Sequence, residues 1–107
     1  MATENIALTE GVYYILLSLH SPLHGYGIMQ KAEELSAGRV RLAAGTLYGA
    51  LGTMLEKGWI RALPGEKNSR KKEYEITAAG RAAAANELVR LRELLRSGEL
   101  IMGEGAR

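Results

Sequence analysis

Cysteine is absent from this chain of 107 residues, which excludes a disulfide scaffold, a thiolate metal site and a cysteine nucleophile. Without cysteines, nothing in the chain requires an oxidising compartment. A long apolar run is absent too, because Val12–Leu19 falls far short of the roughly 18 residues that suggest a membrane span. The N-terminus has neither the basic lead nor the cleavage site of a signal peptide. We therefore expect a cytoplasmic protein with no membrane association, of a length that suits one compact unit.

Net charge is low as well, at +2 with a sequence pI near 9.0, and would not by itself identify a nucleic-acid binder. The distribution of charge is more informative than its sum. Basic residues gather in one stretch of the chain, whereas most acids lie elsewhere. These basic residues are Lys57, Arg61, Lys67, Arg70, Lys71 and Lys72. Such local positive charge is what a docking face for an acidic partner requires.

Combinations of residues that could carry catalysis are scarce. His20 and His24 have the spacing of a helical metal pair, but Pro22 lies between them and no third ligand is near. The segment Gly25–Gly27 does not continue into a dinucleotide fingerprint, and no P-loop lysine follows the later glycines. We therefore expect no enzyme activity, no cofactor and no metal site.

Hydrophobic spacing predicts four helices and one hairpin. Apolar residues recur at intervals of three and four in four segments, which predicts helices at about residues 4–20, 25–36, 44–57 and 78–96. Alternating patterns predict strands at residues 59–63 and 72–76, and a tiny strand at residues 39–42 also fits the pattern. This order is typical of a mainly α winged helix-turn-helix with a small β-hairpin wing, followed by one more helix.

The third predicted helix is the candidate recognition helix. Its polar side offers only small or uncharged groups, namely Thr46, Tyr48, Gly49 and Thr53. None is a usual bidentate base reader, although hydroxyl groups can bond phosphates or bases. Gly45, Gly49 and Gly52 each cost about 1 kcal/mol of helix propensity relative to alanine. The helix is therefore either held tightly by packing or must let something approach closely. A solvated core helix explains the helix alone equally well, and the basic hairpin that follows favours DNA.

The tip of the hairpin is the second candidate DNA contact. Its cations and neutral polar groups could bond phosphates beside the groove, and they are Asn68, Ser69, Arg70, Lys71 and Lys72. A solvated charged loop is the alternative interpretation.

The last predicted helix is the candidate dimer interface. Ala84, Leu88, Leu91 and Leu95 follow heptad spacing, with Val89 and Leu94 beside them. A small winged core cannot bury all of these groups, so we expect a homodimer rather than packing within one chain alone. The residues expected at this interface are Leu8, Val12, Leu88, Leu91, Leu94 and Leu95. The chain then divides into a DNA-binding domain at residues 1–76, a dimerisation helix at 77–97 and a flexible tail at 98–107.

Several of these segments, in this order, resemble the PadR-type transcriptional regulators. The matching segments are Tyr14–Leu19, Pro22–Met29, Gly45–Leu51, Leu55–Ile60 and Lys72–Gly80. The resemblance implies a homodimeric repressor that binds double-stranded operator DNA, with Thr46 and Tyr48 near the DNA backbone and the hairpin tip as the wing. Some members respond to phenolic acids or planar lipophilic compounds, so a small aromatic or lipophilic effector is a candidate ligand. Many members have arginine or lysine after the Leu51 position, where this chain has Gly52. The alternative function is a winged-helix protein-interaction module without specific DNA binding.

Overall fold

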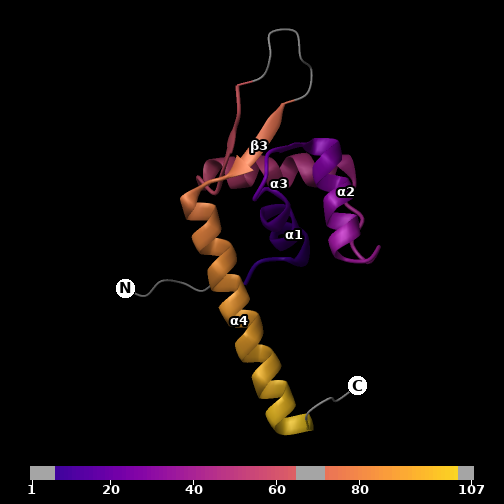
Figure 1. Ribbon diagram of the computed structural model, residues 1–107, viewed down its shortest axis with the longest axis vertical. Helices are drawn as coiled ribbons and strands as arrows, with labels where there is room; N and C mark the ends of the chain where they lie inside the picture. The colour runs from indigo at the N-terminus through magenta and orange to yellow at the C-terminus, as the bar shows by residue number, and fades with distance from the viewer. Residues whose placement is uncertain (1–6, 65–71, 104–107) are drawn as a thin grey trace.

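The computed structural model describes residues 7–64 and 72–103, and α-helices make up most of this part of the chain. The elements in chain order are α1 (Glu10–Ser18), β1 (Leu23–His24), α2 (Gly25–Leu35), α3 (Ala44–Glu56), β2 (Ile60–Ala62), β3 (Glu73–Ile76) and α4 (Ala78–Met102). In Figure 1 the first three helices gather into one body beneath the hairpin, and α4 runs away from it. The molecule therefore measures 56 × 37 × 21 Å. None of the helices in the described residues has the length and apolar character needed to cross a membrane.

The predicted helices at residues 25–36 and 44–57 and the two hairpin strands are confirmed. Consecutive helices α2 and α3 form the helix-turn-helix, and β2 and β3 form the base of the wing. The strands lie in the order β1-β3-β2, and both pairings are antiparallel. The fold is thus a winged helix-turn-helix with one long C-terminal helix.

The third strand of the sheet does not come from residues 39–42, so that interpretation was wrong. It comes from β1, where Leu23 pairs with Tyr74 of β3. The backbone N–H of Val40 donates instead to the Ser36 hydroxyl at 2.9 Å, which holds this segment against the end of α2. A strand at this position would need its backbone groups free for a neighbour.

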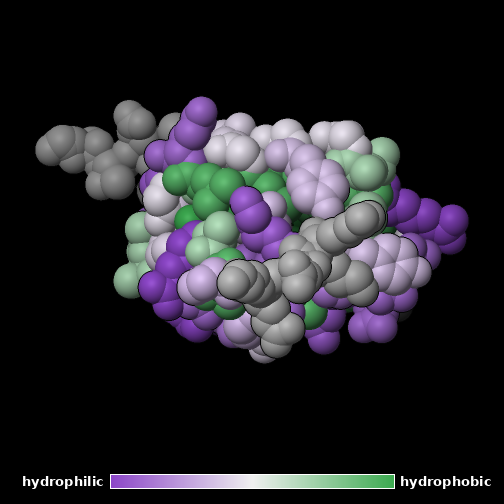
Figure 2. All heavy atoms as spheres, turned by 90° about the horizontal axis from the view of Figure 1, so that it is seen from above, coloured by the Kyte–Doolittle hydropathy of each residue, from purple (hydrophilic) through white to green (hydrophobic). Residues whose placement is uncertain are grey.

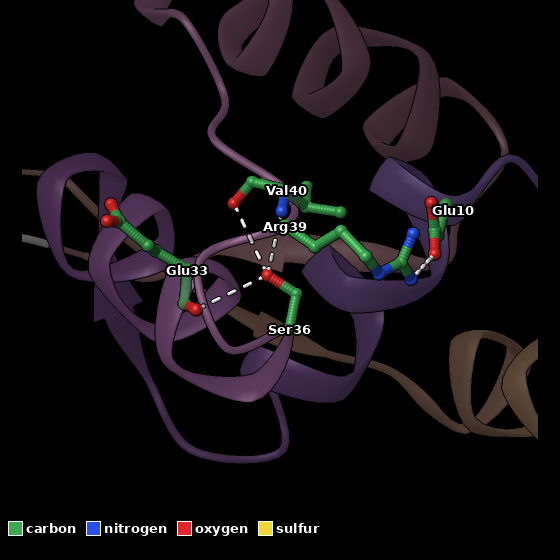
Figure 3. Close-up of polar contacts among 5 residues, drawn as sticks. All are labelled: Glu10, Glu33, Ser36, Arg39 and Val40. Atoms are coloured by element: carbon green, nitrogen blue, oxygen red, sulfur yellow. Dashed lines mark hydrogen bonds and ion pairs between the residues drawn. The ribbon is translucent and has the colours of Figure 1, made fainter.

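Backbone hydrogen bonds and the side chain of Ser36 end α2. The N–H of Gly38 donates to the Glu33 carbonyl at 2.8 Å, and Ala37, in the left-handed conformation with φ 54°, donates to Glu34 at 3.1 Å. This is a Schellman ending. The Ser36 hydroxyl donates to the Glu33 carbonyl at 3.3 Å, and Arg39 reaches across to pair with Glu10 of α1 (Figure 3). These contacts join the turn after α2 to the end of α2 and to α1.

Two helix boundaries differ from the sequence prediction. α1 begins at Glu10 rather than near residue 4, because the Thr9 side chain accepts the N–H of Val12 and caps the helix there. Residues 4–6 lie outside the described residues. α4 runs to Met102, past the predicted end near residue 96, so described residues 98–102 are helical and not part of a tail. The ending falls at Gly103, whose φ of 97° is one that glycine adopts without strain.

The core lies between α1, α2, α3 and the sheet. Its largest fully buried side chains are Ile15, Leu16, Leu19, Ile28, Leu47, Leu51, Met54 and Ile60. The Ile76 N–H donates to the Leu19 carbonyl at 2.9 Å, which ties β3 to the end of α1. This core holds the outer side of α3 away from the body of the protein.

Candidate nucleic-acid interface

The outer side of α3 is exposed along the length of the helix. Leu47, Leu51 and Met54 of α3 point into the core. The opposite side, with Thr46, Tyr48 and the three glycines of the helix, is exposed. At its N-terminal end Ala43 occupies the cap position and provides no side-chain hydrogen bond. The first amides of α3 therefore point outward without a side-chain acceptor, which is the arrangement that attracts anions.

Three glycines form the centre of this exposed side. Gly45, Gly49 and Gly52 are spaced by four and three residues and so lie along one stripe of the helix. A Cβ atom placed on any of them would meet nothing within 4 Å. Contacts among the described residues therefore do not explain these glycines, which leave the backbone of α3 open on this side.

Tyr48 flanks the glycine stripe on the side of α2 and the wing. It is 52% exposed, and its ring lies over Gly25, the buried first residue of α2. Burial raises the pKa of Tyr74 in β3, and the nearby Tyr48 phenol raises it further. Tyr48 thus lies where α3 meets the start of α2.

The two threonines of α3 lie on the other flank. Thr46 is exposed in the first turn. The Thr53 hydroxyl donates to the Gly49 carbonyl at 3.3 Å, and its side chain borders a hollow between α3 and α4. Thr53 is therefore set toward this hollow and less directly outward than the glycines.

One basic residue of the wing, Arg61, is paired with an acid in the described part of the chain. The guanidinium of Arg61 donates to the Glu75 carboxylate directly across the β2–β3 ladder, with Nε at 2.7 Å. Glu73 and Lys72 are both exposed at the start of β3. The tip residues predicted to contact DNA, Asn68, Ser69, Arg70 and Lys71, lie outside the described residues.

A hollow of about 480 Å³ lies between the N-terminal segment, α3 and α4. Its walls are mainly apolar and include Leu8, Val12, Met54 and Trp59. The ammonium of Lys57, also in the wall, lies 5.3 Å from the centroid of the Trp59 ring, within cation–π range. No sequence pattern predicted this hollow.

The predicted dimer residues fall into two groups. Leu8 and Val12 are half-buried and pack against the core of their own chain. Leu91 is half-buried on α4, whereas the other three are exposed, at 40% for Leu88, 55% for Leu94 and 62% for Leu95. The unexpected last turns add further exposed apolar side chains, which are Leu100, Ile101 and Met102.

Both histidine rings lie within hydrogen-bond distance of helix backbone groups. The Nδ1 atom of His24 accepts the Gly27 N–H at 3.3 Å and caps α2, and Nδ1 of His20 lies 3.1 Å from the Leu16 carbonyl oxygen. Within residues 7–64 and 72–103, no group of three or more histidine and acidic side chains has the geometry to hold a metal ion.

Figure 2 looks onto the end of the molecule that carries the wing. Pale residues of near-zero hydropathy occupy much of this end, beside a green hydrophobic strip, and deep purple residues lie mainly toward the sides. The described part of this end is therefore not a continuous charged surface. The exposed side of α3 offers hydroxyl and backbone groups rather than long cationic side chains.

Comparison with known proteins places the chain among transcriptional regulators. The model of the transcriptional regulator PadR-like family matches residues 12–86. An uncharacterized 37.1 kDa protein in transposon TN4556 of Streptomyces fradiae is 39% identical over 66 residues, which are 62% of this chain but 18% of that protein. The chain thus spans less than a fifth of that relative's length.

Solved structures share the fold. A PadR family transcriptional regulator from Eggerthella lenta DSM 2243 superposes with a TM-score of 0.72 at 21% identity, covering 87% of this chain and 82% of that one. Bacillus subtilis PadR in complex with operator DNA superposes with a TM-score of 0.59 at 21% identity, covering 74% and 46%. The fold agrees with the family match over residues 12–86. This chain therefore belongs to the PadR-like family of transcriptional regulators, not to a family of enzymes.

Proposed function

We propose that this protein represses transcription by occupying double-stranded operator DNA as a homodimer, with α3 in the major groove. The observation that carries the proposal is the exposed side of α3, where Gly45, Gly49 and Gly52 leave the helix backbone uncovered next to Tyr48. Family membership and the operator complex of Bacillus subtilis PadR support the same role.

In this proposal α3 contacts the DNA by close packing and hydrogen bonds, and the wing contacts it by charge. The uncapped first turn of α3 and the hydroxyls of Thr46 and Tyr48 bond phosphates or base edges, and the glycine stripe lets the helix sit close to the groove wall. Arg70, Lys71 and Lys72 of the wing then neutralise phosphates beside the groove, with Asn68 and Ser69 adding neutral hydrogen bonds.

Gly49→Ala and Gly52→Ala test the stripe, because stability and affinity should move in opposite directions. Each alanine should raise the free energy of unfolding by about 1 kcal/mol, since alanine is the better helix former. The added methyl groups should weaken binding to the duplex upstream of the protein's own gene, measured by fluorescence anisotropy. Gly11→Ala in α1, whose added Cβ makes only an ordinary 3.4 Å contact with Leu42, is the matched control and should bind DNA as the wild type does.

Wild-type affinity in both α3 variants would show that the stripe does not touch DNA. Failure of the wild-type protein to shift any DNA at low salt would favour a protein-interaction module instead.

The dimer is proposed to form through the outer half of α4. Leu94 and Ile101 are seven residues apart and so share one side of the helix, with Leu95 and Met102 beside them. All four are more than half exposed in the single chain. A two-fold pair of such helices covers both apolar surfaces and sets two copies of α3 against the two halves of an operator.

Leu94→Glu combined with Ile101→Glu should convert the dimer to a monomer in sedimentation velocity at micromolar concentration. Leu100→Glu is the matched control, because Leu100 is 81% exposed but lies on a different side of α4 by its spacing from Leu94. Wild-type protein that sediments as a monomer would refute the dimer.

The hollow beside α3 is proposed to bind a small aromatic or lipophilic effector that releases the DNA. Its walls are apolar apart from a few groups such as Lys57 and Thr53, so a planar ring with one anionic end fits their chemistry. Thr53 and Lys57 belong to the end of α3, so a ligand there changes the position of the recognition helix.

Trp59 is the only tryptophan and borders the hollow, so its fluorescence reports occupancy. Titration with 2-naphthoate should quench Trp59 and lower DNA affinity. Ala83→Leu, which fills the hollow, should abolish both effects, whereas Ala85→Leu on the exposed side of α4 should abolish neither. Quenching that is unchanged in Ala83→Leu would place the ligand elsewhere.

A further inference from the structure

Gly25 lies directly beneath the ring of Tyr48. A Cβ atom built on Gly25 would overlap the Tyr48 hydroxyl oxygen and lie 2.8 Å from Cζ and 3.4 Å from Cε1. Real Cβ atoms essentially never come within 3.0 Å of a heavy atom in another, non-adjacent residue, so the observed position of Tyr48 exists only because residue 25 has no side chain. Gly25 itself is buried, although it lies at the first position of a helix.

The conformation of Gly25 does not explain the glycine. Gly38, Gly58 and Gly103 are the glycines with positive φ in the described residues, and Gly25 is not among them. The first position of a helix accepts most residues. The requirement at residue 25 is therefore for space, and Tyr48 is the residue that uses the space.

The ring also lies against a fixed element of the fold. Gly25 follows β1 directly, and Leu23 of β1 pairs with Tyr74 of β3, so the start of α2 is tied to the sheet. Tyr48 thus lies against a part of the chain that the sheet holds in place. With 52% of its surface exposed, the side chain would otherwise be free to take other rotamers in solvent.

We infer that Gly25 is a positioning residue for DNA binding, because it provides the space in which the Tyr48 side chain is held at the edge of the exposed face of α3. This inference rests on the proposed function, in which the Tyr48 hydroxyl contacts the DNA. A hydroxyl held in one place loses less conformational freedom on binding than one that must first be ordered. Gly25 acts without touching the nucleic acid.

Gly25→Ala should move the tyrosine without unfolding the protein. The atoms in the way are at the far end of the Tyr48 side chain, which can swing into solvent, and alanine is favourable in a first helical turn. The variant should therefore keep the thermal stability of the wild type, while a change in DNA affinity reports the displaced ring.

A double-mutant cycle with full-length protein tests the inference, using the duplex upstream of its own gene. Tyr48→Ala should weaken binding roughly tenfold, the usual effect of losing one hydrogen bond to a charged group. Gly25→Ala should weaken binding by a similar factor, and Gly25→Ala combined with Tyr48→Ala should be no weaker than Tyr48→Ala alone. Gly11→Ala, the same change in the first turn of α1, should have no effect.

A second readout needs no DNA. Nuclear Overhauser contacts between the Gly25 Hα protons and the Tyr48 ring protons should be present in the wild type. The same ring protons should lose their contacts with residue 25 in Gly25→Ala.

The outcomes separate the two ideas. If Tyr48→Ala binds normally, the Tyr48 contact of the proposed function is wrong, and the inference falls with it. If Tyr48→Ala is weak but Gly25→Ala binds normally, only the inference is overturned. Losses that multiply in the double variant would also overturn it, because Gly25 would then act independently of Tyr48.

Discussion

A single methyl group has opposite expected effects at different glycines of this chain, because their surroundings differ. Gly80 in the first turn of α4 lies under the Trp59 carbonyl, and a Cβ there would overlap that oxygen and lie 2.7 Å from Cγ1 of Ile76. The obstacle is backbone, which cannot swing away as the Tyr48 ring can. Gly80→Ala should therefore destabilise the fold by about 1–3 kcal/mol, the usual range for overpacking. Urea denaturation measures this, and an unchanged midpoint would show that α4 can shift without loss.

Glu87 is the buried charge that joins α4 to the N-terminal segment. Its side chain is 3% exposed and accepts hydrogen bonds from Nε of Arg90 at 2.9 Å and from the Leu8 N–H at 3.2 Å. The Arg90 guanidinium lowers the pKa of Glu87 below its ordinary value of 4.5, with the Leu8 N–H acting in the same direction against the opposing effect of burial. A depressed pKa means that the carboxylate stabilises the folded state above about pH 4.5 and that this stabilisation is lost as pH falls through the lower folded-state pKa.

Glu87→Gln should therefore lower the free energy of unfolding at pH 7 by roughly 1–3 kcal/mol, because buried donors lose a charged acceptor. The difference between variant and wild type should shrink as pH falls below about 4.5, since glutamine does not titrate. Chemical denaturation at several pH values measures this. Glu93→Gln, an exposed change on the same helix, is the control, and a difference that persists unchanged in acid would contradict the role of the charge.

At the scale of elements, strong periodicity was enough to predict α2, α3 and the hairpin strands. The start of α1 was set by a local cap, which periodicity does not predict. The apolar pattern before residue 10 reads as helix, but the Thr9 side chain stops it there. The two-residue strand β1 has no pattern of its own and exists because β3 offers a partner. The same holds for the candidate site. The sequence was enough to predict Tyr48 as a site residue from its place on α3. Its packing against Gly25 could not be predicted, because it is a contact between distant segments.

The outer half of α4 gives the element-scale prediction. The outer part of α4 projects from the body in Figure 1, and short helical segments are marginal in water without a partner. In hydrogen exchange, the amides of residues 94–102 should exchange rapidly in dilute protein and slowly where the dimer forms. Core amides such as those of Leu16 and Leu19 should not depend on concentration. Fast exchange of residues 94–102 at every concentration would exclude them from the interface.

At the scale of the whole molecule, the small net charge of +2 leaves DNA affinity dependent on where each charge lies. Arg61 of β2 pairs with Glu75, which competes with any phosphate for its guanidinium, and Lys57 lies over Trp59 beside the hollow. If two subunits neutralise about seven phosphates, the slope of log K against log salt should be near −6. Such a slope would then come largely from the predicted wing contacts, among them Lys72.

Glu75→Gln should release Arg61 toward the DNA. One added phosphate contact per subunit should steepen the slope by about 0.9 for each subunit and raise affinity at low salt. Stability should fall by no more than about 1 kcal/mol, because Arg61 is 66% exposed and pairs at such sites contribute little. Glu99→Gln makes the same change in net charge on an exposed part of α4 far from the wing. Anisotropy titrations at a series of salt concentrations separate the two, and equal slopes in both variants would mean that net charge matters and Arg61 does not reach the DNA.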